Sequence, residues 1–253
     1  MSMFEIVFSP TGGTEKVSGL VTGALDGNIV TVDLTDSGLD FHGVSMAKDD
    51  VAVISVPSYA GRVPAVAVEG LGMVRGNGAR AVLVCFYGGR GFEDTLIELE
   101  DVAKRAGFRV VAAVSAIAEH SVARQFAAGR PDAQDVAQLS EFAQRIWQKL
   151  LDGAASEPSI PGNRPYKQAG GHSMVPHATE DCVSCGACAA LCPVRAIDKD
   201  DPRQVDGEAC ISCMRCVSVC PQNARKLDPN KLAAVTQMLS KACVERRECE
   251  IFI

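Results

Sequence analysis

The sequence has little positive charge and no long apolar run. Its 253 residues include 25 lysines and arginines against 31 aspartates and glutamates, a formal net charge of −6 at pH 7. This balance argues against a nucleic-acid-binding protein, which normally carries a basic stripe. The longest apolar run, around 110–118, is interrupted by Ser115 and falls short of the roughly 18 residues of a membrane-spanning helix. The first residues also lack the basic start and long apolar core of a secretion signal. We therefore expect a cytoplasmic protein.

Cysteine, by contrast, is abundant and unevenly placed. The chain has 11 cysteines, and most of them lie between residues 182 and 220 in two copies of the pattern C-x-x-C-x-x-C-x-x-x-C-P. Soft thiolate ligands in this spacing are typical of [4Fe–4S] clusters. The first copy contains Cys182, Cys185, Cys188 and Cys192, and the second contains Cys210, Cys213, Cys216 and Cys220.

Zinc sites and disulfides are the two alternative uses of these cysteines. A zinc site usually combines two separate Cys-x-x-Cys pairs, which differ from a compact run of three cysteines followed by Cys-Pro. Disulfides are rare in a chain that is not secreted. The spacing therefore favours two [4Fe–4S] clusters.

We expect each copy to divide its cysteines between the two clusters. Three closely spaced cysteines can surround one cluster, whereas the fourth precedes a proline that turns the chain away and so reaches the other cluster. The predicted ligands are Cys182, Cys185, Cys188 and Cys220 for the first cluster, and Cys210, Cys213, Cys216 and Cys192 for the second.

One position differs in character between the copies. Gly186 follows the second cysteine of the first copy, where a positive φ lets backbone N–H groups turn toward cluster sulfurs. Met214 holds the matching place in the second copy. We therefore expect different hydrogen-bond shells. The segment from about Thr179 to Leu227 resembles a bacterial-type two-cluster ferredoxin, which implies a small α+β domain.

Apolar strands alternate with amphipathic helices over the first 150 residues or so. Continuous apolar strands of this kind predict a parallel sheet covered by helices on both faces. We expect an α/β fold with a doubly wound five-stranded sheet in the flavodoxin-like order 2-1-3-4-5. The expected strands cover 4–8, 29–34, 51–56, 81–86 and 108–117, and the expected helices cover 15–25, 63–74, 92–106 and 131–151.

In such a sheet, ligands bind beyond the carboxyl ends of the strands. The loop after the first expected strand reads S-P-T-G-G-T and ends where a helix begins. It lacks the Gly-Lys-Ser/Thr of a nucleotide P-loop and the G-x-G-x-x-G of a dinucleotide site. Its small residues, hydroxyls and helix N-terminus instead suit an anion, although a plain helix-capping turn has the same composition. The loop resembles the phosphate loop of flavodoxins, which implies FMN bound by Ser9, Thr11, Gly12, Gly13 and Thr14.

Two further loops place aromatic residues at the same edge. Two of the three tyrosines of the chain occur in them. A flat flavin ring needs stacking surfaces and polar contacts around its edge, whereas ordinary packing and solvated surface charge are the plainer interpretation. We predict a flavin site that includes Pro57, Ser58, Tyr59, Ala60, Gly61, Arg62, Tyr87, Gly88, Gly89, Arg90 and Gly91.

Together these motifs resemble the flavodoxin–ferredoxin fusion proteins of anaerobes. The resemblance is carried by S-P-T-G-G-T, V-P-S-Y-A-G-R-V-P, F-Y-G-G-R-G-F-E-D and A-E-H-S. Gly89 stands where relatives often have Asn. His120 follows the last expected strand. It has two possible roles, proton transfer or an internal hydrogen bond that fixes the loop. We place the FMN domain at 1–152, a Gly/Pro/Ser-rich linker at 153–177 and the ferredoxin domain at 178–228. The last part, 229–253, is expected to contain a helix (229–243) and an apolar tail (250–253).

The expected function is electron transfer through FMN and two [4Fe–4S] clusters in one chain. The partners we expect are redox proteins with basic docking patches, because the chain is acidic. A second hypothesis is a flavin-dependent reductase of a small organic substrate, fed through the clusters. A third is a ferredoxin with an empty docking domain. The linker is compatible with a flexible tether or an extended strap. Cys85, Cys243 and Cys249 match no cluster motif and are expected to be non-ligands.

Overall fold

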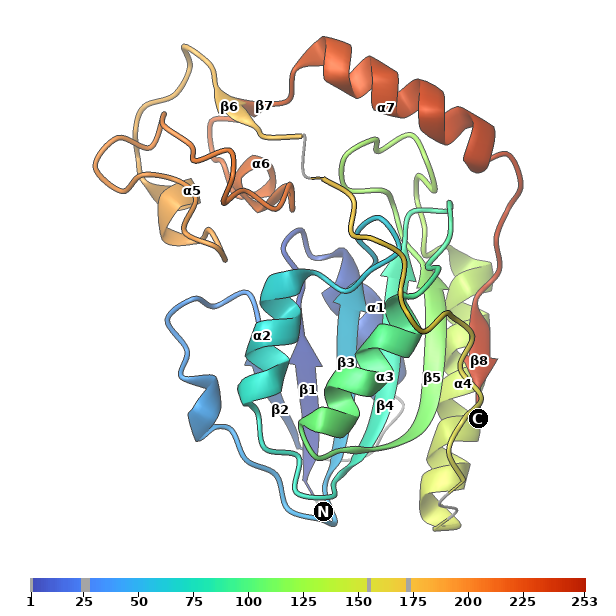
Figure 1. Ribbon diagram of the computed structural model, residues 1–253. Helices are drawn as coiled ribbons and strands as arrows, with labels where there is room; N and C mark the ends of the chain where they lie inside the picture. Colours follow the sequence, from blue (N-terminus) through green and yellow to red (C-terminus); the bar gives the residue numbers. More distant parts are fainter. Residues whose placement is uncertain (1, 24–27, 154–155, 172–173) are drawn as a thin grey trace.

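The computed structural model describes residues 2–23, 28–153, 156–171 and 174–253. Its first domain is a sheet with helices on both faces (Figure 1). The strands are β1 (Met3–Val7), β2 (Ile29–Asp33), β3 (Val51–Pro57), β4 (Arg80–Tyr87) and β5 (Arg109–Ile117), and the helices are α1 (Gly13–Thr22), η1 (Phe41–Gly43), α2 (Ala65–Met73), α3 (Thr95–Arg105) and α4 (Ala133–Leu151). The end of the helix expected at 15–25 lies outside the described residues.

The strand order confirms the predicted topology. The five strands are parallel and run in the order β2-β1-β3-β4-β5, with the switch between β1 and β3. Every residue of β3 is buried, as its apolar sequence predicts. One apolar core lies between the sheet and the helices α2 and α3, and a second lies between the sheet and α1 and α4. The carboxyl ends of all five strands therefore meet at one edge.

The sheet also has a sixth strand that the sequence did not predict. The tail forms β8 (Glu250–Phe252), which pairs antiparallel with Ala113–Ser115 of β5. It covers the exposed hydrogen-bonding edge of β5, which would otherwise be open to other chains. The C-terminus is thereby fixed to the first domain after crossing from the second.

The second domain is small and lies above the carboxyl ends of the strands (Figure 1). It contains β6 (His177–Ala178), α5 (Ala187–Ala190), α6 (Arg215–Ser218) and β7 (Arg225–Lys226), with β6 and β7 paired antiparallel. Its apolar core is limited to a few residues around Ile197 and the cysteines. Helix α7 (Pro229–Ala242) follows, with Asp228 capping its first N–H groups. So small a core depends on further cross-links for stability.

The described part of the linker is a strap packed along α3. The buried Asp94 accepts hydrogen bonds from the backbone N–H of Asn163 (2.8 Å), from the Asn163 side chain (3.0 Å) and from the N–H of Lys167 (2.8 Å). Arg164 forms ion pairs with Glu100 and Asp101. Of the two forms that the sequence allowed for the linker, residues 156–171 therefore adopt the extended one.

Among the described segments, no helix is long and apolar enough to cross a membrane.

Candidate functional site

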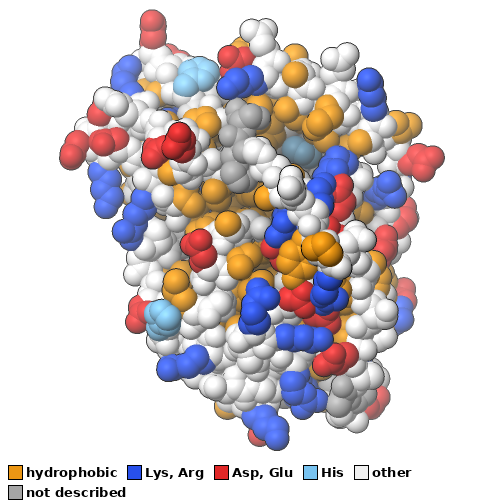
Figure 2. All heavy atoms as spheres, in the orientation of Figure 1, with side chains coloured by type: hydrophobic (Ala, Val, Ile, Leu, Met, Phe, Trp, Pro, Cys, Tyr) orange, Lys and Arg blue, Asp and Glu red, His pale blue; other side chains and the backbone are white. Residues whose placement is uncertain are grey.

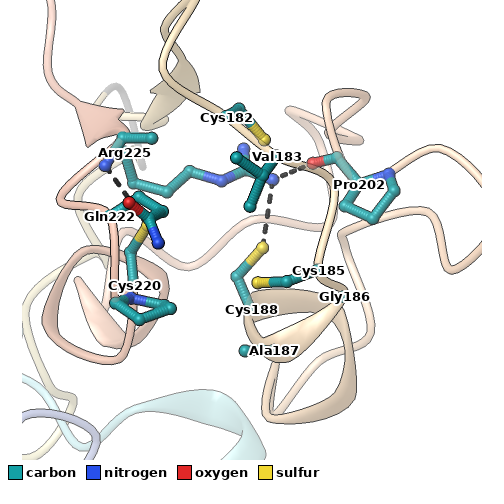
Figure 3. A pocket seen from close by; sticks show the side chains of 12 residues that line it. Cys182, Val183, Cys185, Gly186, Ala187, Cys188, Pro202, Cys220, Gln222 and Arg225 are labelled. Carbon is teal, nitrogen blue, oxygen red and sulfur yellow. Dashed lines mark hydrogen bonds between the residues drawn. The ribbon is translucent and has the colours of Figure 1, made fainter.

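The cysteines gather into two groups, each at its own small cavity. The first cavity is lined by Cys182, Cys185, Cys188 and Cys220, together with the buried Arg225 (Figure 3). The second is lined by Cys192, Cys210, Cys213 and Cys216. In both cavities the fourth cysteine comes from the other copy of the motif. This is the crossed arrangement expected from the spacing.

The two groups suit a cluster better than a single ion. No set of three or more His, Cys, Asp or Glu within the described ranges is close enough to hold one metal ion. A [4Fe–4S] cube binds each thiolate at a different iron, so its ligands lie farther apart than those of one ion. Burial raises the pKa of the Cys213 thiol to about 11 and of Cys216 to about 12. Such buried thiolates need a compensating positive charge, which iron supplies.

The backbone has the same form at the two positions where the copies differ. Gly186 has φ 76° and Met214 has φ 64°, and each precedes a short helix, α5 or α6. Glycine adopts this left-handed conformation freely, whereas methionine pays a steric cost. The Met214 side chain is only 3% exposed, and its burial offsets that cost. At this position the two copies therefore differ in the side chain and not in the backbone conformation.

Arg225 is a central cation that the sequence did not single out. It is 2% exposed, and its Nη2 donates to Cys188 Sγ at 3.4 Å and to the carbonyl of Pro202 (Figure 3). Its charge also lowers the pKa of Cys210 and Cys216, against the larger effect of burial. Arg225 therefore favours thiolates in both groups. No spacing rule indicates it, because it lies outside the cysteine pattern.

A cavity of about 270 Å³ lies between the sheet edge and the second domain. On the face drawn in Figure 2, hydrophobic side chains gather near this junction. Its far wall includes Ile211 and Ser212, which lie between two cysteines of the second group. Helix α7 adds Val235 and Met238, and the linker adds Gly170, Gly171 and Met174. The sheet side is formed by Pro57, Ser58, Tyr59, Ala60, Phe86, Tyr87, Gly88, Glu119, His120, Ser121 and Val122.

The loop after β3 is a tight turn that presents Tyr59 to this cavity. Tyr59 and Arg62 exchange two backbone hydrogen bonds, and both central residues are left-handed, Ala60 at φ 52° and Gly61 at φ 84°. A side chain at Gly61 would collide with Glu93, so the turn requires glycine there. Burial and the neighbouring Cys213 raise the pKa of Tyr59. Tyr59 thus links the sheet edge to the second cysteine group.

The structure does not bring all the predicted flavin residues to the cavity. Arg62 is held by Glu98 at 2.7 Å and by the carbonyl of Lys167 at 2.6 Å. Arg90 pairs with Glu93 at 2.5 Å. Both arginines therefore hold loops and the strap in place, and neither is among the residues that line the cavity. Gly61, Gly89 and Gly91 also lie outside the lining residues, with positive φ values that shape their loops.

The Ser9–Thr14 loop lies beside the cavity, at the start of α1. A Cβ placed on Gly13 would lie 3.5 Å from the ring of Phe86, which lines the cavity. Ser9 Oγ accepts the N–H of Glu15 at 2.9 Å, so its own proton is free to point elsewhere. Thr14 is 1% exposed, and its hydroxyl has no partner among the described residues. Thr11 is partly buried and Gly12 is exposed.

His120 fixes the loop after β5. Its Nδ1 accepts the backbone N–H groups of Val122 (3.2 Å) and Ala123 (3.1 Å). Burial, and then the positive Arg90, lower the pKa of His120. The ring is therefore neutral at pH 7, with Nδ1 as acceptor. These contacts support the loop-fixing interpretation of His120 over proton transfer.

One family model matches part of the chain. Residues 174–221 match the model of the 4Fe-4S dicluster domain. No curated protein matches the chain. The matched part is an iron–sulfur domain, and the protein is therefore a redox protein.

Solved structures similar to this chain include several flavodoxins. A flavodoxin of Streptococcus pneumoniae TIGR4 shares 21% identity over 58% of this chain and 99% of its own, with a TM-score of 0.41. Flavodoxin 1 of Bacillus cereus shares 14% identity over 58% and 98%, with a TM-score of 0.43. A flavodoxin from the Archaea shares 12% identity over 60% and 99%, with a TM-score of 0.43.

Proposed function

We propose that this chain transfers electrons between FMN and two [4Fe–4S] clusters, and exchanges them with other redox proteins. The observation that carries the proposal is the cavity between the domains. One wall is the sheet edge with Tyr59 and Tyr87, and the other is Ile211 and Ser212, between the cysteines of the second group. A ligand in this cavity lies next to the second cluster. FMN exchanges one or two electrons and each cluster exchanges one, so together they convert between paired and single-electron chemistry.

The residues present fit FMN. Buried hydroxyls without a partner among the described residues occur at Thr14, beside the phosphate loop, and at Ser212, in the cavity wall. A buried polar group normally has a hydrogen-bond partner, and FMN offers acceptors at its phosphate and around its ring. Tyr59 and Tyr87 supply aromatic surface. Ser9, Thr11, Gly12, Gly13 and Thr14 would hold the phosphate, and Pro57, Ser58, Ala60 and Gly88 would surround the ring.

The two clusters occupy different places in this proposal. We assign Cys210, Cys213, Cys216 and Cys192 to the cluster beside the cavity, and Cys182, Cys185, Cys188 and Cys220 to the outer cluster. Cys185 is exposed, and Val183, two positions before it, is 65% exposed. The exposed acids Glu180 and Asp181 precede them. A partner with a basic patch would dock there and exchange electrons with the outer cluster.

The size of the cavity favours a carrier over a reductase with its own organic substrate. Pockets for one small ligand usually measure about 300–1,000 Å³, and this cavity holds about 270 Å³. A flavin ring would fill it. Met238 of α7 and Ile211 line the cavity opposite the sheet edge, so a flavin ring would lie between these side chains and the sheet. His120, bound to two backbone N–H groups, gives no support for a proton donor.

The test is a count of cofactors in protein purified without oxygen. Acid releases the non-covalent groups, and flavin, iron and sulfide are measured per chain. We expect close to one FMN and about eight irons, the number that two cubane clusters require. Full iron without flavin, even after incubation with FMN, would overturn the FMN part and leave a ferredoxin on a docking domain.

A further inference from the structure

One arginine of the cluster domain reaches the predicted phosphate loop of the other domain. Arg215 lies inside the second cysteine motif, directly before Cys216, in the short helix α6. Its Nη1 donates to the carbonyl of Ser9 at 3.4 Å. Its Nε is buried and has no partner among the described residues. The described ion pairs include none with Arg215. A guanidinium that leaves a buried donor unpaired is costly unless a further acceptor binds there.

The loop that Arg215 approaches is built for an anion but has no cation of its own. None of the residues from Ser9 to Thr14 is basic. The first N–H groups of α1 have no acceptor within the helix, and its dipole favours negative charge. The buried Thr14 hydroxyl is unpartnered among the described residues. A Cβ placed on Gly12, which has φ +83°, would meet no atom within 4 Å, so there is open space over the loop.

We infer that Arg215 is a ligand of the FMN phosphate, supplied to the first domain by the cluster domain. The inference rests on the proposed binding of FMN. The loop would contribute hydroxyls and N–H groups, and Arg215 would contribute the charge-assisted hydrogen bonds that guanidinium groups form with phosphate. The phosphate site is then complete only when the two domains are docked. Bound FMN would therefore hold the two domains together.

A second interdomain arginine provides a matched control. Arg195 also belongs to the cluster domain, and its side chain contacts the backbone carbonyl and the hydroxyl of Ser37. It therefore crosses the same interface, at a place separate from the Ser9–Thr14 loop. Its loss would weaken docking without removing a phosphate contact. Any effect specific to Arg215 is thereby separated from a general loosening of the domains.

The experiment measures the affinities of FMN and riboflavin for the full chain with its clusters in place. Riboflavin lacks the phosphate, so the ratio of the two affinities isolates the phosphate site. Arg215→Gln, Arg215→Lys and Arg195→Gln are compared with the unaltered chain by flavin fluorescence quenching. Iron content and the visible cluster spectrum establish that each variant is folded. Inorganic phosphate is added as a competitor.

In Arg215→Gln, we expect FMN affinity to fall by roughly 10- to 100-fold, as for the loss of a charged hydrogen bond, with riboflavin affinity unchanged. Arg215→Lys should recover part of the loss, and Arg195→Gln should leave the FMN-to-riboflavin ratio unaltered. Inorganic phosphate should compete with FMN in the unaltered chain more than in Arg215→Gln. An unaltered ratio in Arg215→Gln, or equal losses for both flavins, would overturn the inference while FMN binding stands. No flavin binding by the unaltered chain would overturn the proposed function itself, and this inference with it.

Discussion

The two copies of the cysteine motif have the same spacing but opposite surroundings. The start of the first copy is open to solvent, with Cys185 exposed and Val183 65% exposed, whereas its Cys188 and Cys192 are each 8% exposed. The second copy faces the sheet domain, with Cys213 8% and Met214 3% exposed. Ile211, between its first two cysteines, packs against the core of the other domain. The motif therefore determines the geometry of the cysteine ligands. The position of each copy relative to the sheet domain determines whether its cluster would exchange electrons with the flavin or with a partner protein.

The largest expected effect comes from removing one cluster at a time. Cys213→Ser and Cys185→Ser should each lose about four of about eight irons. In Cys185→Ser the cluster beside the cavity (the inner cluster) remains. Flavin reduction by a reductant generated with a light flash should therefore stay close to the rate in the unaltered chain. In Cys213→Ser it should slow markedly, because only the outer cluster remains. Absorbance at the flavin and cluster bands follows both. Equal rates in the two variants would show that the copies are not ordered as we propose.

The second prediction loosens the strap that positions the cluster domain. Asp94→Ala removes the acceptor for the N–H groups of Asn163 and Lys167, each worth about 1.5–3 kcal/mol as a hydrogen bond to a charged group. We expect proteolysis within 156–171 and similar rates of iron loss to a chelator from the two clusters. The unaltered chain should lose outer-cluster iron first. Asp94→Asn, which keeps one acceptor oxygen, should be intermediate.

The Asp94 contact should persist through the neutral range of pH. Burial would raise the pKa of Asp94, but hydrogen bonds from Lys167 and Asn163 lower it below the ordinary value. Its contribution to stability is therefore present above the ordinary pKa of about 3.9 and is lost as the pH falls through the lower folded value. A strap that becomes protease-sensitive already at pH 6 would contradict this assignment.

The third prediction exchanges the residues at the position where the copies differ. Gly186→Ala should cost about 1–2 kcal/mol from the left-handed backbone alone, because its Cβ would meet no atom within 4 Å. Met214→Gly relieves that strain but loses about 1.5–3 kcal/mol of burial, which leaves a net cost of about 1 kcal/mol. For a small domain, each 1 kcal/mol lowers the midpoint of thermal cluster loss by about 4–8 °C. A higher midpoint in Met214→Gly would show that the methionine is not stabilising.

The smallest expected effect concerns His120, which lines the cavity between the sheet edge and the second domain. Its pKa is lowered by burial and by Arg90, so its contribution to stability is full above about pH 6.5 and is lost as the pH falls through the lower folded pKa. His120→Asn keeps an acceptor for the loop but does not titrate. We expect this variant to lose less stability between pH 7.5 and pH 5.5 than the unaltered chain does. Denaturant unfolding at each pH measures it, and an unchanged pH dependence would contradict the assignment.

The sequence predicted those features that depend on the spacing of residues close together in the chain. Apolar runs predicted the five parallel strands, the choice of a flavodoxin-like topology gave their order, and the cysteine spacing predicted how the thiols would group. Contacts between distant segments left no such pattern. The three residues of β8 pair with β5 more than 130 positions away, and Pro and Gly allowed the linker either a flexible or an extended form.

Charged residues show the same limit. The sequence placed Arg62 and Arg90 at the flavin, but it could not show that Glu98 and Glu93 lie nearer. Arg215 is visible within the cysteine motif, yet its contact with Ser9 depends on how the domains dock. Met214 has a left-handed backbone that its residue type disfavours.

The most direct test of the account is the kinetic order of flavin reduction. A flash-generated reductant delivers electrons to the holoprotein at several protein concentrations, and absorbance follows their passage from the clusters to the flavin. If FMN lies in the cavity beside Ile211 and Ser212, the rate constant will be the same at every concentration, because the transfer occurs within one chain. A rate that rises in proportion to protein concentration would mean transfer between molecules and would contradict the proposed relay.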